Sequence, residues 1–238
     1  MGKILFVLGA SSDIGSMLIK SSIDNYTNVI AHYHCWNDKL EELKQDYESK
    51  ILFVQADFTD IDSVNAMIAY IKEKNMIPDH IVHFPAAKVF NKKFEKLECE
   101  EFQIGWEISV YSFVVILQNF LPFMKKKKYG KVVVMLSKYT KNVPPKYQSS
   151  YVTVKYALLG LLKSLAVEYE DKGITFNGVS PDMTDTKFIS ELPDLLKEQY
   201  ASNKAKHRIL NIEEVIPTFQ YLLSDGADCV SGANILIE

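Results

Sequence analysis

Short runs of β-branched and aliphatic residues recur along the chain, with helix-length amphipathic segments between them. We expect seven strands in this pattern, at residues 3–8, 28–33, 51–55, 80–84, 131–136, 174–179 and 234–237. Most of these runs lack the polar/apolar alternation of a half-exposed strand, which is typical of a parallel sheet buried on both faces. The sequence therefore predicts a doubly wound α/β fold, with helices on both faces of a seven-stranded parallel sheet.

The segments between the predicted strands carry apolar residues at spacings of three and four, as helices with one buried face do. We expect helices at residues 13–25, 37–47, 61–74, 100–126, 150–170 and 212–223. At 238 residues, the chain has the size of one large Rossmann-type domain, which we assign to residues 1–238. The polar segment 182–208 contains Pro193, and we interpret it as an inserted helical lid.

The composition excludes several classes of partner. The formal net charge is -3 and Arg208 is the single arginine, so the chain lacks the guanidinium contacts typical of nucleic-acid-binding surfaces. The one basic run, Lys125 to Lys128, follows an apolar stretch, where cations suit a helix C-terminus. That stretch, residues 110–124, is broken by polar residues and Pro122, so we expect a buried helix and no membrane contact.

The cysteines and histidines indicate a compartment and argue against a metal site. Three cysteines without a CxxC pair fit a reducing compartment, and we expect a cytoplasmic protein. The first predicted strand begins within three residues of Met1, so we expect no signal peptide. His32 and His34 share a strand face, but no third ligand has suitable spacing, and we interpret both as ordinary histidines.

Small or unusual residues follow several predicted strands directly. In open α/β sheets, ligands bind beyond the carboxyl ends of the strands, near the point where strand order reverses. The first strand is followed by the turn Gly9-Ala-Ser-Ser-Asp-Ile-Gly15, whose backbone amides and helix N-terminus suit a pyrophosphate. Later strands are followed by Asp57, by His83-Phe-Pro-Ala-Ala87, by Ser137 and by the segment 180–186.

Tyr151 and Lys155 lie four residues apart at the start of an apolar helix-patterned run, fourteen residues after Ser137. Positions i and i+4 share a helix face, so both side chains can reach the same cavity. A phenol has a pKa of about 10, but a nearby ammonium stabilises its phenolate and lowers that pKa toward neutrality. Because Tyr70 and Lys74 show the same spacing, the position after Ser137 is what distinguishes the pair.

In the order of these residues and motifs along the sequence, the chain resembles the short-chain dehydrogenase/reductase family over essentially its whole length. The family's turn TGxxxGxG corresponds to residues 8–15, where Asp13 replaces the middle glycine. The resemblance implies a bound nicotinamide cofactor. It implies the cofactor-binding residues Gly9, Ser11, Ser12, Asp13, Ile14, Gly15, His34, Asp57, Phe58, Pro85, Ala86, Tyr151, Lys155, Pro181 and Thr186.

The resemblance also implies catalytic roles for Ser137, Tyr151 and Lys155. Tyr151 would donate a proton to the substrate carbonyl oxygen and Ser137 would hydrogen-bond that oxygen. Lys155 would acidify Tyr151 and bind the nicotinamide ribose. The family's catalytic asparagine falls on Ser109, which we include in the catalytic set, and its Asn-Asn-Ala-Gly segment reads His83-Phe-Pro-Ala86 here.

Several of these assignments have alternatives. Gly9 and Gly15 could form an ordinary strand-to-helix turn, Tyr151 could be a core tyrosine with Lys155 at the surface, and Ser137 could simply end a strand. The resemblance implies that Asp57 lies beside the adenine ring, but the same residue could instead cap the following helix. Thr186 is expected to bind the nicotinamide carboxamide, or else to be a lid residue without a ligand. For His83 we favour a structural histidine over one that handles protons.

The segment after the second strand bears on the choice between NAD and NADP. An acidic residue at the strand end would bind the ribose and repel a 2′-phosphate, but residues 32–37 contain no carboxylate, and Asp38 comes one step later. No arginine is present there, and His34, Asn37 and Lys39 are the groups available to a phosphate. We favour NADP(H), with NAD(H) as the alternative.

We expect an NAD(P)-dependent oxidoreductase that reduces a keto group of a small-molecule or carrier-linked substrate. The pattern is closest to 3-oxoacyl reductases, and the YxxxK spacing excludes the enoyl-reductase branch, whose tyrosine is set farther from the lysine, where Gln148 stands here. One alternative is a sugar or polyol dehydrogenase. Another is a catalytically inactive nucleotide-binding regulator, motivated by Asp13, Ser109 and the segment that begins at His83.

Two expectations concern partners. The predicted helices 100–126 and 150–170 match those through which the family pairs its subunits, so the resemblance implies a homodimer or homotetramer. An acidic carrier protein would need a basic surface near the lid, which Lys204, Lys206 and Arg208 could supply.

Overall fold

The computed structural model of the protein describes residues 2–89, 91–189, 194–202 and 208–238. Within these residues, seven strands form one parallel sheet in the order β3-β2-β1-β4-β5-β6-β7. The strands are β1 (Ile4–Leu8), β2 (Asn28–Tyr33), β3 (Ile51–Gln55), β4 (His80–His83), β5 (Gly130–Met135), β6 (Ile174–Pro181) and β7 (Asn234–Ile237). Strand order reverses between β1 and β4, and this confirms the predicted doubly wound, single-domain fold.

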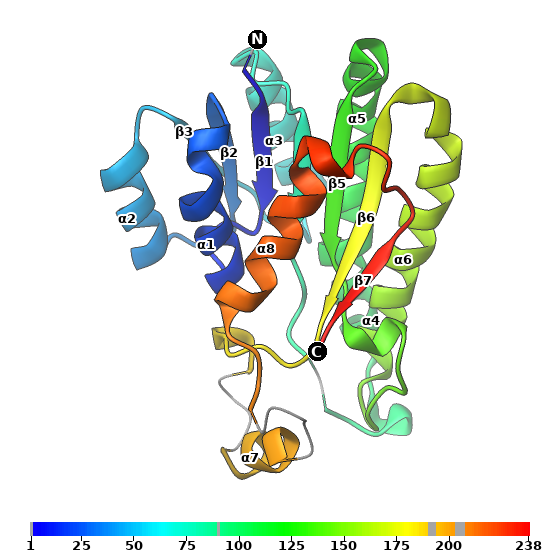
Figure 1. Ribbon diagram of the computed structural model, residues 1–238. Coiled ribbons are helices and arrows are strands. Elements are labelled where there is room, and N and C mark those ends of the chain that lie inside the picture. The colour runs from blue at the N-terminus through cyan, green and yellow to red at the C-terminus, as the bar shows by residue number, and fades with distance from the viewer. Residues whose placement is uncertain (1, 90, 190–193, 203–207) are drawn as a thin grey trace.

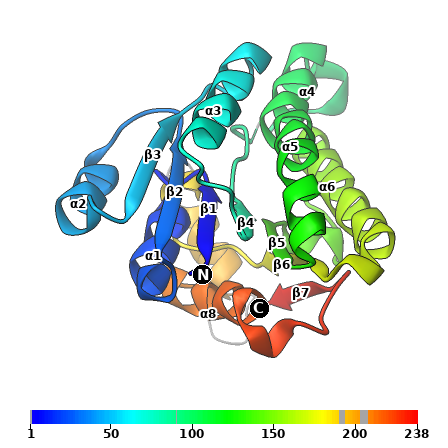
Figure 2. The ribbon, with the colours of Figure 1, turned by 90° about the horizontal axis from the view of Figure 1, so that it is seen from above.

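Helices cover both faces of the sheet (Figure 2). They are α1 (Asp13–Ser22), α2 (Asp38–Tyr47), α3 (Ile61–Glu73), α4 (Cys99–Trp106), α5 (Ser112–Lys127), α6 (Ser149–Glu168), α7 (Asp194–Ser202) and α8 (Ile212–Leu223). One apolar core lies between the sheet and helices α3, α5 and α6, and a second lies between the sheet and helices α1, α2 and α8. The carboxyl ends of the strands point toward α7, the gold helix in Figure 1.

The long helix predicted at residues 100–126 is interrupted. Between α4 and α5, the five residues Glu107–Tyr111 form a π-helical turn, in which the Ser112 N–H bonds the carbonyl of Glu107, five residues earlier. Such a π-bulge is a single widened turn within an otherwise α-helical segment, and π-bulges are frequent at functional sites. Here the turn carries Ser109, whose side chain is buried.

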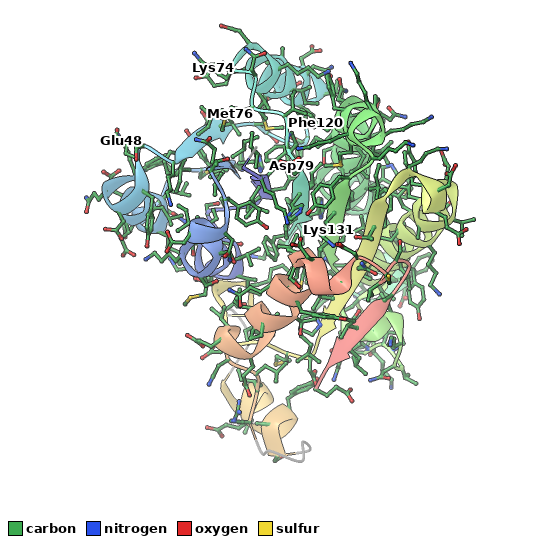
Figure 3. All side chains as sticks on the ribbon, turned by 45° about the horizontal axis from the view of Figure 1, so that its top comes forward. Glu48, Lys74, Met76, Asp79, Phe120 and Lys131 are labelled. Atoms are coloured by element: carbon green, nitrogen blue, oxygen red, sulfur yellow. The ribbon has the colours of Figure 1, made fainter. Side chains whose placement is uncertain are left out.

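Buried contacts also stabilise the amino-terminal ends of the strands, opposite the carboxyl ends. The Asp79 carboxylate, labelled in Figure 3, accepts a hydrogen bond from the Ile4 N–H at 2.8 Å. Lys131 is buried and pairs with Asp228 at 2.5 Å. Phe120 of α5 packs edge-on against Phe6 of β1, with 6.0 Å between ring centres.

Two helical stretches, Cys99–Lys127 and Ser149–Glu168, are long and apolar enough to cross a membrane. Both contribute buried residues to the apolar core on one face of the sheet, as core helices do.

Candidate active site

A cavity of about 620 Å³ opens beyond the carboxyl ends of β1, β4, β5 and β6. Ten residues predicted for the site line it: Ser11, Ser12, Asp13, Ile14, Ala86, Ser137, Tyr151, Lys155, Pro181 and Thr186. The lining does not include the other predicted residues, which are Gly9, Gly15, His34, Asp57, Phe58, Pro85 and Ser109. The topology therefore brings Ser137, Tyr151 and Lys155 to the same cavity as residues 11–14 of the turn after β1.

The turn after β1 is shaped by its two glycines. Gly9 has φ +80°, a conformation that favours glycine, and a Cβ on Gly15 would lie 2.4 Å from the Gly9 carbonyl oxygen. The Ser12 hydroxyl donates to the Gly9 carbonyl at 2.7 Å and accepts from the Gly15 N–H at 3.0 Å. This tight turn leads straight into α1, whose N-terminus faces the cavity and can bind an anion.

Asp13, the first residue of α1, is held from two sides. Its Oδ2 accepts the Lys187 N–H at 2.7 Å, and its Oδ1 pairs with the Lys39 ammonium at 2.9 Å. The carboxylate therefore joins the turn to α2 and to the segment after β6.

Beside the turn after β1, His32 has a structural role. Its Nδ1 accepts the Gly9 N–H and its Nε2 contacts the Ala56 carbonyl oxygen, both at 3.2 Å. Burial lowers the pKa of His32 to about 4, so the ring is neutral. The ring of Phe58 stacks on it at 4.0 Å, whereas His34 is exposed.

Asp57 makes a turn rather than a helix cap. Its Oδ1 accepts the Thr59 N–H at 2.9 Å and the Thr59 hydroxyl at 2.7 Å, and these bonds lower the pKa of Asp57. The residue that caps α3 is Asp60, so the helix-cap alternative for Asp57 is wrong. The second oxygen of Asp57 lies 3.7 Å from His34.

Ser137 lies two residues after the end of β5, next to a hydrogen-bonded polar network. Its carbonyl accepts the hydroxyl of Thr140, which also receives the Asn234 amide, each at 2.8 Å. The Ser180 hydroxyl donates to Asn234 at 2.6 Å. These buried bonds connect the end of β5 with β6 and β7 and fix the position of Ser137.

Tyr151 and Lys155 lie on the first turns of α6, as predicted, and both line the cavity. Burial raises the pKa of Tyr151 to about 12, and a hydrogen bond with Ser137 acts in the opposite direction. The Lys155 Nζ donates to the Met135 carbonyl at 2.8 Å and lies 5.7 Å from the centre of the Tyr151 ring.

The expected acidification of Tyr151 by Lys155 is not found in this structure. Burial lowers the pKa of Lys155 to about 8, and its ammonium is directed at the carbonyl of Met135. Desolvation of the phenol therefore outweighs the hydrogen bond with Ser137, which acts to lower the pKa of Tyr151.

The segment after β4 replaces the family's asparagines with an apolar lining. His83 is fully buried, its ring lies 4.4 Å from that of Phe113, and neither of its nitrogens has a partner among the described residues. Burial lowers the pKa of His83 well below its ordinary value, so the ring is neutral, which fits a structural histidine. Pro85 packs beside Gly9, and Ala86 faces the cavity.

A second cavity, of about 20 Å³, adjoins the first behind Lys155. Ser109, Ser150, Tyr151 and Lys155 are among the residues that line it. The Ser109 hydroxyl is buried and has no partner among the described residues. This volume accommodates a single water molecule.

The segment after β6 connects the cavity to α7. The Lys138 ammonium pairs with the Asp182 carboxylate at 2.7 Å, and Tyr200 of α7 hydrogen-bonds the same carboxylate. Thr186 donates to the Thr184 carbonyl at 3.4 Å and faces the cavity. Parts of the predicted lid, residues 190–193 and 203–207, including Lys204 and Lys206, lie outside the described residues.

Sequence reasoning gave no individual role to several residues that line the cavity, including some within the segments 83–87 and 180–186. They are Phe84, Lys88, Val89, Asn91, Met135, Leu136, Lys138, Tyr139, Gln148, Asp182, Met183, Thr184, Lys187, Phe188 and Ile189. Seven of them, Phe84, Leu136, Lys138, Tyr139, Asp182, Met183 and Thr184, come within four residues after a strand end, and that position was the one signal that could have found them.

Comparison with known proteins shows the family and the fold of the chain. The family described as Enoyl-(Acyl carrier protein) reductase matches residues 9–238. The 3-oxoacyl-[acyl-carrier-protein] reductase FabG of Staphylococcus aureus is 26% identical over 241 residues, covering 100% of this chain and 97% of that protein.

Two solved structures are similar in fold. "ElxO with NADP Bound" has a TM-score of 0.87 at 22% identity, covering 100% of this chain and 97% of that one. "4-hydroxyisoleucine dehydrogenase complexed with NADH" has a TM-score of 0.90 at 22% identity, with coverages of 99% and 97%. With the match over residues 9–238, the chain belongs to the short-chain dehydrogenase/reductase family of NAD(P)-dependent oxidoreductases.

Proposed function

We propose that the protein reduces a keto group to a secondary alcohol with a nicotinamide cofactor. The observation that carries this proposal is that Ser137, Tyr151 and Lys155 line the same cavity, with Tyr151 hydrogen-bonded to Ser137 and 5.7 Å between the Lys155 Nζ and the centre of the Tyr151 ring. A phenol and a hydroxyl can donate hydrogen bonds to a carbonyl oxygen, and an ammonium stabilises the negative charge that follows proton transfer.

The turn after β1 fits a dinucleotide, because its glycines bring the backbone close to the N-terminus of α1 and leave no Cβ in the way. We assign the pyrophosphate to the backbone amides of residues 11–15, and the nicotinamide end to Pro181 and Thr186. Asp57 and Phe58 would border the adenine. When bound, the cofactor supplies the hydride.

Tyr151 is the proton donor in this mechanism. Its pKa of about 12 keeps the phenol protonated at neutral pH, which a general acid requires. The hydrogen bond with Ser137 favours release of the proton, and the Lys155 charge stabilises the resulting phenolate. A water in the small cavity, between Ser109 and Lys155, would connect Lys155 to the hydroxyl of Ser109.

For the substrate we favour a 3-oxoacyl thioester, with NADP(H) as cofactor. The 3-oxoacyl-[acyl-carrier-protein] reductase of S. aureus supports this class, and Val89, Phe188 and Ile189 give the cavity an apolar side for an acyl chain. The carrier surface has less support, because Arg208 is engaged by Glu214 through two bonds, at 2.6 and 2.7 Å.

A sugar or polyol dehydrogenase is the second candidate. The Lys138–Asp182 ion pair next to Ser137 presents charged donors and acceptors to the cavity, and such groups suit a hydroxylated substrate.

We also propose a cytoplasmic homodimer or homotetramer. Exposed aromatic residues gather on helices α4 to α6 and the turn between α4 and α5, namely Trp106, Tyr111, Phe123 and Tyr156. Their burial against a second copy would remove a large apolar area from water. The three cysteines are free, as expected in a reducing compartment.

The test is a titration of the protein with NADPH and with NADH, followed by turnover assays on 3-oxoacyl thioesters and keto-sugars. We expect binding of at least one cofactor and turnover of the thioesters. Turnover of sugars alone would favour the second candidate, and tight binding without any turnover would favour a nucleotide-binding regulator. Binding of neither cofactor would contradict the proposal.

A further inference from the structure

Asp13 occupies an unusual place for a carboxylate, at the anion-binding N-terminus of α1. Its side chain is 15% exposed and contacts two groups from distant segments, the Lys187 N–H and the Lys39 ammonium. Burial opposes ionisation of Asp13, but the Lys187 and Lys39 contacts outweigh it and lower the pKa of Asp13 below its ordinary value. Asp13 is therefore an anion at neutral pH.

Lys39 lies where the cofactor's adenosine ribose is expected. Lys39 is the second residue of α2, shortly after the end of β2. The Asn37 amide donates a hydrogen bond to the Ser11 carbonyl at 2.8 Å, and this bond joins the start of α2 to the turn after β1. In dinucleotide-binding folds, residues shortly after the second strand bind the ribose 2′-OH or a 2′-phosphate. Within residues 9–15 and 34–41, the basic residues are Lys39 and the exposed His34.

The ion pair between Asp13 and Lys39 is only partly accessible to water. The two side chains are 15% and 26% exposed, so solvent screens the pair less than it would a surface pair. The Lys187 N–H also holds the second oxygen of Asp13 and keeps the carboxylate from rotating away. A 2′-phosphate would have to share Lys39 with Asp13 or displace it, whereas a plain ribose would not.

We propose that Asp13 sets cofactor selectivity by holding Lys39 in an internal ion pair, which weakens the preference for a 2′-phosphate. This inference rests on the proposed function, because it assumes that the crevice binds a nicotinamide dinucleotide. Asp13 and Lys39 act as one selectivity unit: the lysine attracts the phosphate and the aspartate limits that attraction.

The experiment measures the affinities of NADPH and NADH by fluorescence titration and compares their ratio among variants. In Asp13→Asn, the amide oxygen can still accept the Lys187 N–H, but the charge is lost. We expect this variant to raise the NADPH-to-NADH affinity ratio about tenfold, the scale of one charge-assisted contact. Lys39→Met should lower the ratio, and the double variant should behave like Lys39→Met.

The ratio isolates selectivity from general damage to the turn, because both cofactors share the same pyrophosphate. Lys44→Met, which removes an exposed lysine from the same helix, is the matched control and should leave the ratio unchanged. The proposal is overturned if Asp13→Asn leaves the ratio unchanged, or raises it equally with and without Lys39. If Asp13→Asn does not fold, a ratio in Lys39→Met equal to that of the unmodified protein overturns it.

Failure of the proposed function gives a different result. An unmodified protein that binds neither cofactor would defeat the proposed function. Binding of both cofactors with a ratio that no variant changes would defeat only the inference about Asp13 and Lys39.

Discussion

The two flanks of the cavity are built from polar residues in opposite ways. Behind Ser137, on the β5–β6 side, Thr140, Ser180 and Asn234 bond one another at 2.6 to 3.1 Å. On the β4–α5 side, the ring nitrogens of His83 and the hydroxyl of Ser109 have no hydrogen-bond partner among the described residues. On the first flank the polar side chains hydrogen-bond one another, and we call it the satisfied flank. On the second flank these polar groups have no hydrogen-bond partner among the described residues, and we call it the unconnected flank.

The difference indicates which flank fixes the chemistry. A buried polar group without a partner costs about 1–3 kcal/mol, whereas a satisfied network holds its members in one geometry. Ser137 belongs to the satisfied flank through its carbonyl, and the proposed proton donor Tyr151 is joined to this flank by its hydrogen bond with Ser137. The other flank can change more freely, and the replacement of the family's asparagines lies there.

The largest expected effect is on the satisfied flank, in Tyr151→Phe. Loss of the proton donor should lower turnover by as much as about 10⁴-fold, while cofactor affinity changes little because the ring is kept. Steady-state kinetics and cofactor titration measure the two quantities. Tyr221→Phe, which changes an exposed tyrosine on α8 away from the cavity, is the control. Unchanged turnover in Tyr151→Phe would mean that this flank does not carry the chemistry.

The next effect concerns stability in acid. Burial lowers the pKa of His32 to about 4, of His80 to about 3, and of His83 well below its ordinary value. Each ring stays neutral when folded but binds a proton near pH 6.5 when unfolded, so the unfolded state takes up more protons below that pH. The stability that comes from these three neutral rings is therefore fully present above pH 6.5. Below pH 6.5 the free energy of unfolding falls, by up to about 4 kcal/mol per pH unit for the three rings together.

Denaturant unfolding at pH 7, 6 and 5 measures this loss. His83→Leu should reduce the pH dependence by about a third and also remove the unpartnered nitrogens. Equal free energies of unfolding at pH 7 and pH 5 would contradict the prediction.

The two flanks also differ in how far the sequence predicted them. The strands, the turn from Gly9 to Gly15, and the positions of Ser137 and Tyr151 follow from local pattern and spacing. The satisfied network could not be predicted, because it joins Thr140 and Ser180 to Asn234, 94 residues from Thr140 along the chain. The partners of Asp13 and the π-helical turn at Ser109 likewise depend on tertiary packing, which the periodicity of a sequence does not predict.

A third effect should separate activity from stability above neutral pH. Burial lowers the pKa of Lys155 to about 8, so the free enzyme loses this charge as pH rises. We expect kcat/KM for the cofactor to fall by up to about tenfold per pH unit above pH 8. The unfolded lysine keeps its proton to about pH 10.4, so stability rises with pH in the same window, by about 1.4 kcal/mol per pH unit. A flat activity profile up to pH 10 would contradict the role of Lys155.

The smallest effect is on the unconnected flank, in Ser109→Ala. If the Ser109 hydroxyl is simply unpartnered, its removal should stabilise the fold by about 1 kcal/mol and leave kcat unchanged, because a desolvation cost disappears. If it instead holds a water beside Lys155, stability should not rise and kcat should fall severalfold. Thermal unfolding and steady-state kinetics on the same preparation distinguish the two, with Ser150→Ala, which lines the same small cavity, as the comparison. The second result would make the two flanks alike in kind, with water completing the one that side chains leave open.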